Sequence, residues 1–88
     1  MKKINILPEI ADRFELPSDA LGEMRLTLTG GGRLMAENHS GIIEYRSERL
    51  VLAAGRRKLI VSGSGLTVAA MKGKTLIVCG KIQMLELE

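Results

Sequence analysis

The chain has 88 residues, of which 45% are hydrophobic and 26% are charged, and its formal net charge is +3. This length allows one domain with one core, and the apolar content excludes a compositionally disordered chain. The positive excess is too small for the dense basic stripe of a nucleic-acid-binding protein. We therefore expect one small folded domain that does not bind nucleic acid.

One cysteine and one histidine restrict the redox and metal chemistry of the chain. Cys79 cannot form a disulfide within the chain, and His39 alone cannot complete a cysteine and histidine metal cage with it. A single cysteine in an apolar strand is typical of a protein kept in a reducing cytoplasm. The apolar runs are too short for a signal-peptide core or a membrane span. We expect a cytoplasmic protein with no metal and no cofactor.

Residues 1–22 are predicted to form an N-terminal helical segment. Apolar residues recur there at helical spacing, and Pro8 suits the first turn of a helix. Leu16 precedes Pro17, which favours an extended conformation, so the helix should end near Glu15. The apolar residues on this spacing are Ile6, Leu7, Ile10, Ala11 and Phe14.

After Gly22 the pattern changes to strand alternation, with glycines at the joints. We expect residues 23–88 to form an all-β domain, an immunoglobulin-like antiparallel sandwich of two sheets and about eight short strands. The similarity of residues 59–63 (LIVSG) to residues 76–80 (LIVCG) leaves a β-solenoid or β-roll as the alternative. The predicted strands are 24–29, 33–37, 42–45, 49–54, 58–62, 66–71, 75–79 and 82–87.

The polar stretch Glu37-Asn38-His39-Ser40-Gly41 admits a catalytic or a structural interpretation. His39 with Glu37 or Glu44 could form a general base and its orienting group, but a catalytic site also needs a nucleophile or an activated water held by further groups, and a single histidine with no metal partner gives it little support. Asn38 and Gly41 are typical of a turn, because both tolerate backbone angles that other residues avoid. We therefore interpret Glu37, Asn38, His39 and Gly41 as a structural turn, with no catalytic residue in the chain.

Two sets of residues are candidates for contact with partners. The middle residues of three apolar triplets, Val51, Ile60 and Ile77, should point to the second face of the sheet, where the helix or a protein partner would cover them. The basic loop of Arg56, Arg57 and Lys58 could be joined in space by Arg46 and Arg49. Such a cluster is either a solvated surface or a site for anionic membrane or an acidic protein. The glycines at 30–32 and 63–65 are interpreted as hairpin connections.

The chain resembles the YabP/YqfC family of sporulation proteins, and it is most similar to the YqfC branch. The resemblance rests on ELP at 15–17, ENHSGIIEY at 37–45, LIVSGSGL at 59–66 and VCGKI at 78–82. It implies an immunoglobulin-like fold and a non-enzymatic role in spore-envelope assembly in the mother cell, at the forespore surface. It also implies a membrane-anchored sporulation protein as partner.

From these observations we expect an assembly module that binds other proteins and copies of itself. The alternative is a basic module for an anionic membrane surface or an acidic partner. A hydrolase built on His39 is the third hypothesis, and it predicts a pocket with a nucleophile beside the imidazole ring.

Overall fold

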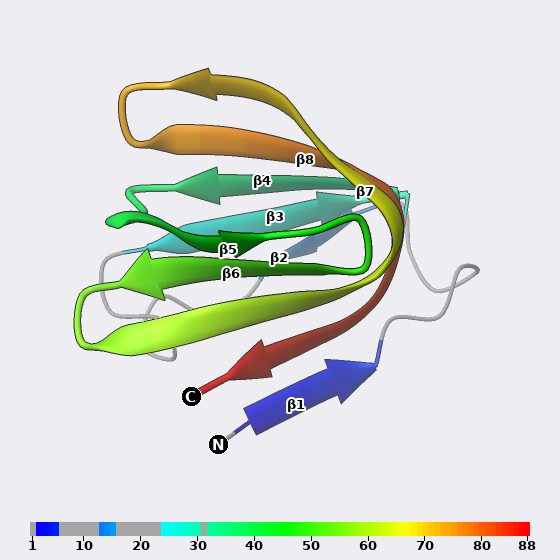
Figure 1. Cartoon of the computed structure of the whole chain (residues 1–88), viewed down its shortest axis with the longest axis horizontal. Helices are drawn as coiled ribbons and strands as arrows, with labels where there is room; N and C mark the ends of the chain where they lie inside the picture. Colours follow the sequence, from blue (N-terminus) through cyan, green and yellow to red (C-terminus); the bar gives the residue numbers. More distant parts are fainter. Residues whose placement is uncertain (1, 6–12, 16–23, 31) are drawn as a thin grey trace.

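The structure is a computed structural model that describes residues 2–5, 13–15, 24–30 and 32–88. These residues form one antiparallel sheet of eight strands (Figure 1). The strands are β1 (Lys2–Asn5), β2 (Arg13–Glu15), β3 (Arg25–Thr29), β4 (Arg33–Glu37), β5 (Gly41–Tyr45), β6 (Arg49–Ala54), β7 (Arg57–Lys72) and β8 (Thr75–Leu87).

The strand order in the sheet is β2-β3-β4-β8-β7-β6-β5, with β1 paired to the C-terminal part of β8. Hairpins join β3 to β4, β5 to β6, β6 to β7 and β7 to β8. The β4–β5 connection instead leads from one side of the paired strands β7 and β8 to the other. The two long strands therefore form the spine of the sheet.

Both long strands bend where glycines allow their backbones to approach closely. A Cβ on Gly63 would collide with the carbonyl oxygen of Lys81. A Cβ on Gly80 would lie 2.6 Å from the carbonyl oxygen of Gly65, and Gly80 has a φ of 137°, which other residues rarely adopt. The pairing register of β7 and β8 shifts on either side of this point. The sheet consequently folds over on itself, with the bend on the right in Figure 1.

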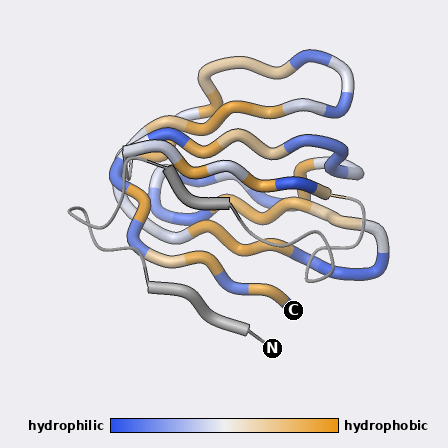
Figure 2. Tube along the Cα trace, turned by 180° about the vertical axis from the view of Figure 1, so that it is seen from behind, coloured by the Kyte–Doolittle hydropathy of each residue, from blue (hydrophilic) through white to orange (hydrophobic). Residues whose placement is uncertain are grey.

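The fold creates two layers within one sheet. The β3–β4 layer contains β2, β3, β4 and the parts of β7 and β8 nearest their shared turn, residues 67–72 and 75–79. The β5–β6 layer contains β5, β6, β1 and the remaining parts, residues 57–62 and 84–87. Hydrophobic stretches lie along the strands and hydrophilic residues occupy most turns (Figure 2).

The core lies between the two layers and is almost entirely aliphatic. Burial of each leucine, isoleucine or valine side chain contributes about 1.5–3 kcal/mol, so this single core supplies the main stabilising term. The buried cluster contains Met24, Leu26, Leu28, Leu34, Ala36, Leu50, Leu52, Ala54, Leu59, Val61, Leu66, Leu76, Val78, Ile82, Leu85 and Leu87.

Three hydrogen bonds fasten the β5–β6 turn to the bend of β7. The backbone N–H groups of Gly63 and Leu66 donate to the carbonyl oxygens of Glu48 and Ser47, at 3.1 and 2.8 Å. The N–H of Val68 donates to the Tyr45 hydroxyl at 2.8 Å. Because Tyr45 belongs to the β5–β6 layer and Val68 to the β3–β4 layer, this bond connects the layers directly.

The all-β prediction is confirmed, but the two-sheet sandwich is wrong. Residues 58–62 and 66–71 belong to one strand, as do residues 75–79 and 82–87, because Gly63, Gly65 and Gly80 bend the strands without ending them. The same two strands pair on both sides of the bend, so both layers belong to one sheet. Every pairing among the described strands is antiparallel, which also differs from the stacked coils of a β-solenoid.

The predicted N-terminal helix is not found in the described part of residues 1–22. Lys2–Asn5 pairs with β8, and Arg13–Glu15 pairs with β3, so both stretches are strands of the same sheet. The remaining residues of the predicted helix lie outside the described residues. Phe14, which has helical spacing to the apolar residues before it, lies opposite Leu28 in the sheet.

None of the described residues belongs to a helix that is long and apolar enough to cross a membrane.

Replacing either bend glycine with alanine should destabilise the fold. In Gly63→Ala or Gly80→Ala the added methyl group meets a backbone oxygen that cannot move without disturbing β7–β8 pairing. We therefore expect the free energy of unfolding to fall by about 1–3 kcal/mol or more. Urea unfolding would measure it. Ser64→Ala, at an exposed position between the two contacts, is the matched control and should unfold like the wild type. Wild-type stability in both glycine variants would contradict the assigned bend.

Candidate functional site

The connection from β4 to β5 joins the turns at the end of the sheet opposite the bend. The backbone N–H groups of Asn38 and His39 both donate to the carbonyl oxygen of Lys74, at 2.9 and 3.2 Å. Ser40 donates its N–H to the Ala53 carbonyl oxygen at 2.8 Å, and its hydroxyl accepts the N–H of Gly55 at 3.1 Å. We call residues 38–40, 55–56 and 73–74 together the turn end.

Local backbone geometry places this connection. Asn38 has a φ of 66°, which asparagine tolerates better than most residues, and Gly41 has a φ of 149°. These angles turn the chain out of β4 and back into β5. The sequence ENHSG therefore forms a short connection from the β3–β4 layer to the β5–β6 layer.

His39 is the one buried histidine side chain at the turn end. His39 is 6% exposed, and neither ring nitrogen, Nδ1 or Nε2, has a hydrogen-bond partner among the described residues. Glu44, one of the two acids considered as an orienting group, lies at the other end of β5 and pairs with arginines. The described contacts thus provide His39 with no orienting carboxylate and no nucleophile, which a general base requires.

The five basic candidate residues lie at opposite ends of the β6–β7 hairpin. Arg49 is opposite Ser62 and Arg57 is opposite Ala54, so the two ends are separated by roughly 17 Å at 3.3 Å per residue. Arg46 and Arg49 instead bind the same carboxylate oxygen, Oε2 of Glu44, each at 3.4 Å. The structure therefore does not bring these five residues together.

The turn end gathers a different basic set. The tight connection through residues 38–40 brings the β6–β7 turn and the β7–β8 turn to one end of the molecule. Exposed Arg56 and Lys58 thus share that end with exposed Lys72 and Lys74, and Arg57 is half-buried beside them. The spacing of basic residues in the sequence does not show this convergence, because it depends on which turns meet.

Val51, Ile60 and Ile77 are absent from the buried core cluster between the layers, as expected for residues on the second face of the sheet. Val51 and Ile60 lie opposite each other and are each 3% exposed in the single chain. Ile77 is half-buried and lies opposite Met35 and Ala70. In this conformation only Ile77 of the three is partly accessible to a partner, and a contact role for them stays a prediction.

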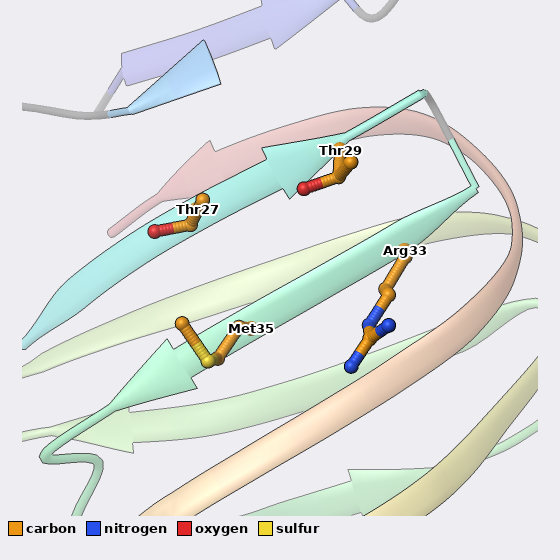
Figure 3. A pocket seen from close by; sticks show the side chains of 4 residues that line it. All are labelled: Thr27, Thr29, Arg33 and Met35. Atoms are coloured by element: carbon orange, nitrogen blue, oxygen red, sulfur yellow. The ribbon is translucent and has the colours of Figure 1, made fainter. Parts of the chain in front are cut away.

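A shallow hollow of about 290 Å³ lies on the outer face of β3 and β4. Figure 3 shows its four lining side chains, Thr27 and Thr29 from β3 and Arg33 and Met35 from β4. The pairs Thr27–Met35 and Thr29–Arg33 are direct cross-strand neighbours. The guanidinium of Arg33 and the hydroxyl of Thr29 are exposed to water in this hollow. Polar contacts to a small ligand would compete with water there, so the hollow offers little binding energy.

Two strand edges carry the exposed apolar surface of the described chain. β5 pairs only with β6, and residues 67–72 of β7 pair only with β8, so each has one side without a described partner strand. All large hydrophobic residues that are exposed in the described chain lie on these edges: Ile42, Ile43, Tyr45 and Met71, at 37, 53, 50 and 58% exposure. We call β5 together with residues 67–72 the seam.

The seam is a continuation of the hydrophobic core. Ile42, Tyr45 and Met71 lie directly opposite Leu52, Leu50 and Leu76, which are fully buried core residues. Cross-strand neighbours project from the same face of a sheet, so the core face extends outward to both edges. The hydrogen bond from Val68 to Tyr45 brings the two edges together near the bend. Sequence analysis placed these residues in strands but did not identify which strands lie at the edges.

A model of the YabP family matches residues 21–88, and the chain therefore belongs to the YabP family. This membership associates the protein with sporulation and confirms the family part of the sequence resemblance. The assignment to the YqfC branch stays a prediction. Searches of curated proteins and of solved structures gave no match.

Replacing the His39 ring with an aliphatic side chain should preserve or increase stability. A buried polar group without a partner costs about 1–3 kcal/mol, and His39→Leu removes that cost while filling similar space. We expect the free energy of unfolding of His39→Leu, measured in urea, to lie between the wild-type value and about 1 kcal/mol above it. His39→Ala, which leaves a cavity, should be less stable than His39→Leu. A strongly destabilised His39→Leu would show that the ring nitrogens are satisfied in solution.

Proposed function

We propose that the chain is a non-enzymatic protein-binding module in the assembly of the spore envelope in the mother cell. Membership of the YabP family supports the connection with sporulation. The single structural observation that supports protein binding is the exposure of core-face side chains at the seam. The sequence resemblance to the YqfC branch favours a membrane-anchored sporulation protein as the partner.

The physical basis of this proposal is the cost of leaving a core open to water. Ile42, Tyr45 and Met71 extend a buried aliphatic surface, and each is more than a third exposed. Covering apolar surface contributes about 25 cal/mol per Å², and tyrosine and methionine are enriched where proteins meet. A protein partner that covers the seam would complete the apolar enclosure that the single chain leaves unfinished.

The proposal predicts a specific complex in sporulating cells. A tagged chain, cross-linked during sporulation and purified, should be recovered with a defined sporulation protein, and the two purified proteins should then bind each other directly. His39→Leu should support spore formation as well as the wild type, because no reaction depends on the ring. Recovery of the chain alone, or a spore defect in a correctly folded His39→Leu protein, would contradict the proposal.

Anionic surface binding is a second candidate function, favoured by the basic side chains at the turn end. Arg56, Lys58, Lys72 and Lys74 are exposed on neighbouring turns, whereas Arg46 and Arg49 share the carboxylate of Glu44. Several cations at one end would be attracted to anionic lipid headgroups, each contributing about 1 kcal/mol near the surface. Salt should weaken this attraction, because the residues are solvent-exposed.

Cosedimentation with phosphatidylserine vesicles tests this second function. Lys72→Gln combined with Lys74→Gln should reduce binding at low salt by about tenfold or more, which corresponds to ~1.4 kcal/mol. Arg46→Gln combined with Arg49→Gln removes the same charge from the other end and should have a smaller effect. Equal losses in the two double variants, or binding that does not change with salt, would contradict a role for the turn end.

A further inference from the structure

We propose that the seam binds an extended segment of a partner protein as an added β-strand, one that alternates aliphatic residues and carries acidic residues at its ends. This inference rests on the proposed protein-binding function and identifies its surface and ligand chemistry. It is derived from three features of the seam: the direction of its backbone groups, its apolar side chains and the charges at its two ends.

The backbone at both edges has N–H and C=O groups that face no partner strand among the described residues. Arg46 and Arg49 exchange two backbone hydrogen bonds, at 2.8 and 3.3 Å, and so form the pair that closes the β5–β6 turn. In an antiparallel ladder the next pair is not hydrogen-bonded, so the N–H and C=O of Tyr45 point away from β6. The two-residue turn Gly73–Lys74 closes on Lys72 and Thr75, and by the same alternation the backbone groups of Met71 point away from β8.

The side chains at the seam match an apolar strand. Ile42 and Tyr45 on one edge and Met71 on the other project from the face that forms the core. An added strand would place every second side chain against this face and the intervening ones toward solvent. Its aliphatic residues would therefore have to alternate, as in the recognition of extended peptides by other exposed sheet edges.

The charges at the seam favour acidic residues in the segment. Lys72 and Lys74 are exposed at the turn end of β7. At the other end of the seam, Arg46 and Arg49 have side chains that are 71 and 48% exposed, against one half-buried carboxylate, that of Glu44. Acidic residues flanking the aliphatic ones would meet positive charge at each end of the bound segment.

A second folded copy of the chain fits this surface less well than an extended segment. A twofold pairing of copies would use one edge, either β5 or residues 67–72, and would leave the apolar residues of the other edge exposed. Both edges are also irregular, since the pairing register shifts between Ile42 and Glu44 and between Val68 and Ala70. A folded copy would have to present an edge that matches these shifts, whereas an extended segment can adapt its backbone to them.

The test uses the full chain and a blocked, fluorescently labelled nine-residue peptide in which valine and threonine alternate between terminal glutamates. We expect saturable binding by fluorescence anisotropy. A peptide with serine in place of valine, and one with terminal lysines in place of the glutamates, should each bind at least about tenfold more weakly. Failure of the first peptide to bind, or equal binding of all three, would overturn the inference.

Two variants of Met71 place the binding at the seam. Met71→Pro removes an N–H that points away from β8 and should leave β7–β8 pairing intact, so the variant should fold but lose at least about tenfold in peptide affinity. Met71→Lys adds charge at the same edge and should act similarly, whereas Gln83→Lys, at an exposed position on β8, should bind the peptide like the wild type. Unchanged binding by folded Met71→Lys would overturn the inference.

Sedimentation velocity and the cellular complex separate the remaining outcomes. Dimers that form with rising concentration and disappear in Met71→Lys would identify a second copy as the occupant and overturn the inference. If no peptide binds but a purified sporulation partner still binds both the wild type and Met71→Lys, the inference fails while the proposed function stands. If the chain has no protein partner in sporulating cells, the proposed function itself fails.

Discussion

The close approach of two strand backbones at the bend is the constraint on which the rest of the structure depends. Gly63 lies against the carbonyl oxygen of Lys81, and Gly80 lies against that of Gly65, in space that no Cβ could share. This contact lets one sheet fold over while β7 and β8 remain paired on both sides of the bend. The leucines of β3 and β4 thereby meet those of β6 and β7, so a chain with few aromatic residues can still enclose a core.

The local part of the fold could be predicted from sequence, and the long-range part could not. Alternation fixed β4 and β6 with the bounds that the structure shows, because residues 33–37 and 49–54 carry their own pattern and turn signals. The hydrophobic pattern predicts that strands end at the glycines at 63, 65 and 80. Their actual role depends on a contact between residues 63 and 81, and hydrophobic pattern carries no information about such a pairing. The two-sheet prediction failed for this reason.

The same limit explains the outcome for the candidate site. The stretch ENHSG was recognisable as a turn from Asn38 and Gly41, but its partners, Lys74 and the Ala53–Gly55 segment, could not be read from local sequence. Arg46 and Arg49 are close in sequence to Arg56, yet the length of β6 holds them at the other end of the molecule. The exposed residues of the seam were missed because an apolar strand residue has the same appearance whether its strand is central or at an edge.

The bend that closes the core is also the reason that the seam stays open. Residues 57–62 of β7 pair with β6, but beyond the bend residues 67–72 turn away into the other layer and leave β6 behind. β5 then has no described strand on its far side, and the hydroxyl of Tyr45 reaches Val68 only near the bend, where the layers converge. Farther along, Ile42 and Met71 have no described strand between their edges. Pairing these edges within one chain would require either another strand or a straighter β7, and a straighter β7 would separate the layers and expose the core. The proposed partner strand fits this arrangement, because it would pair with an edge that the described residues leave open.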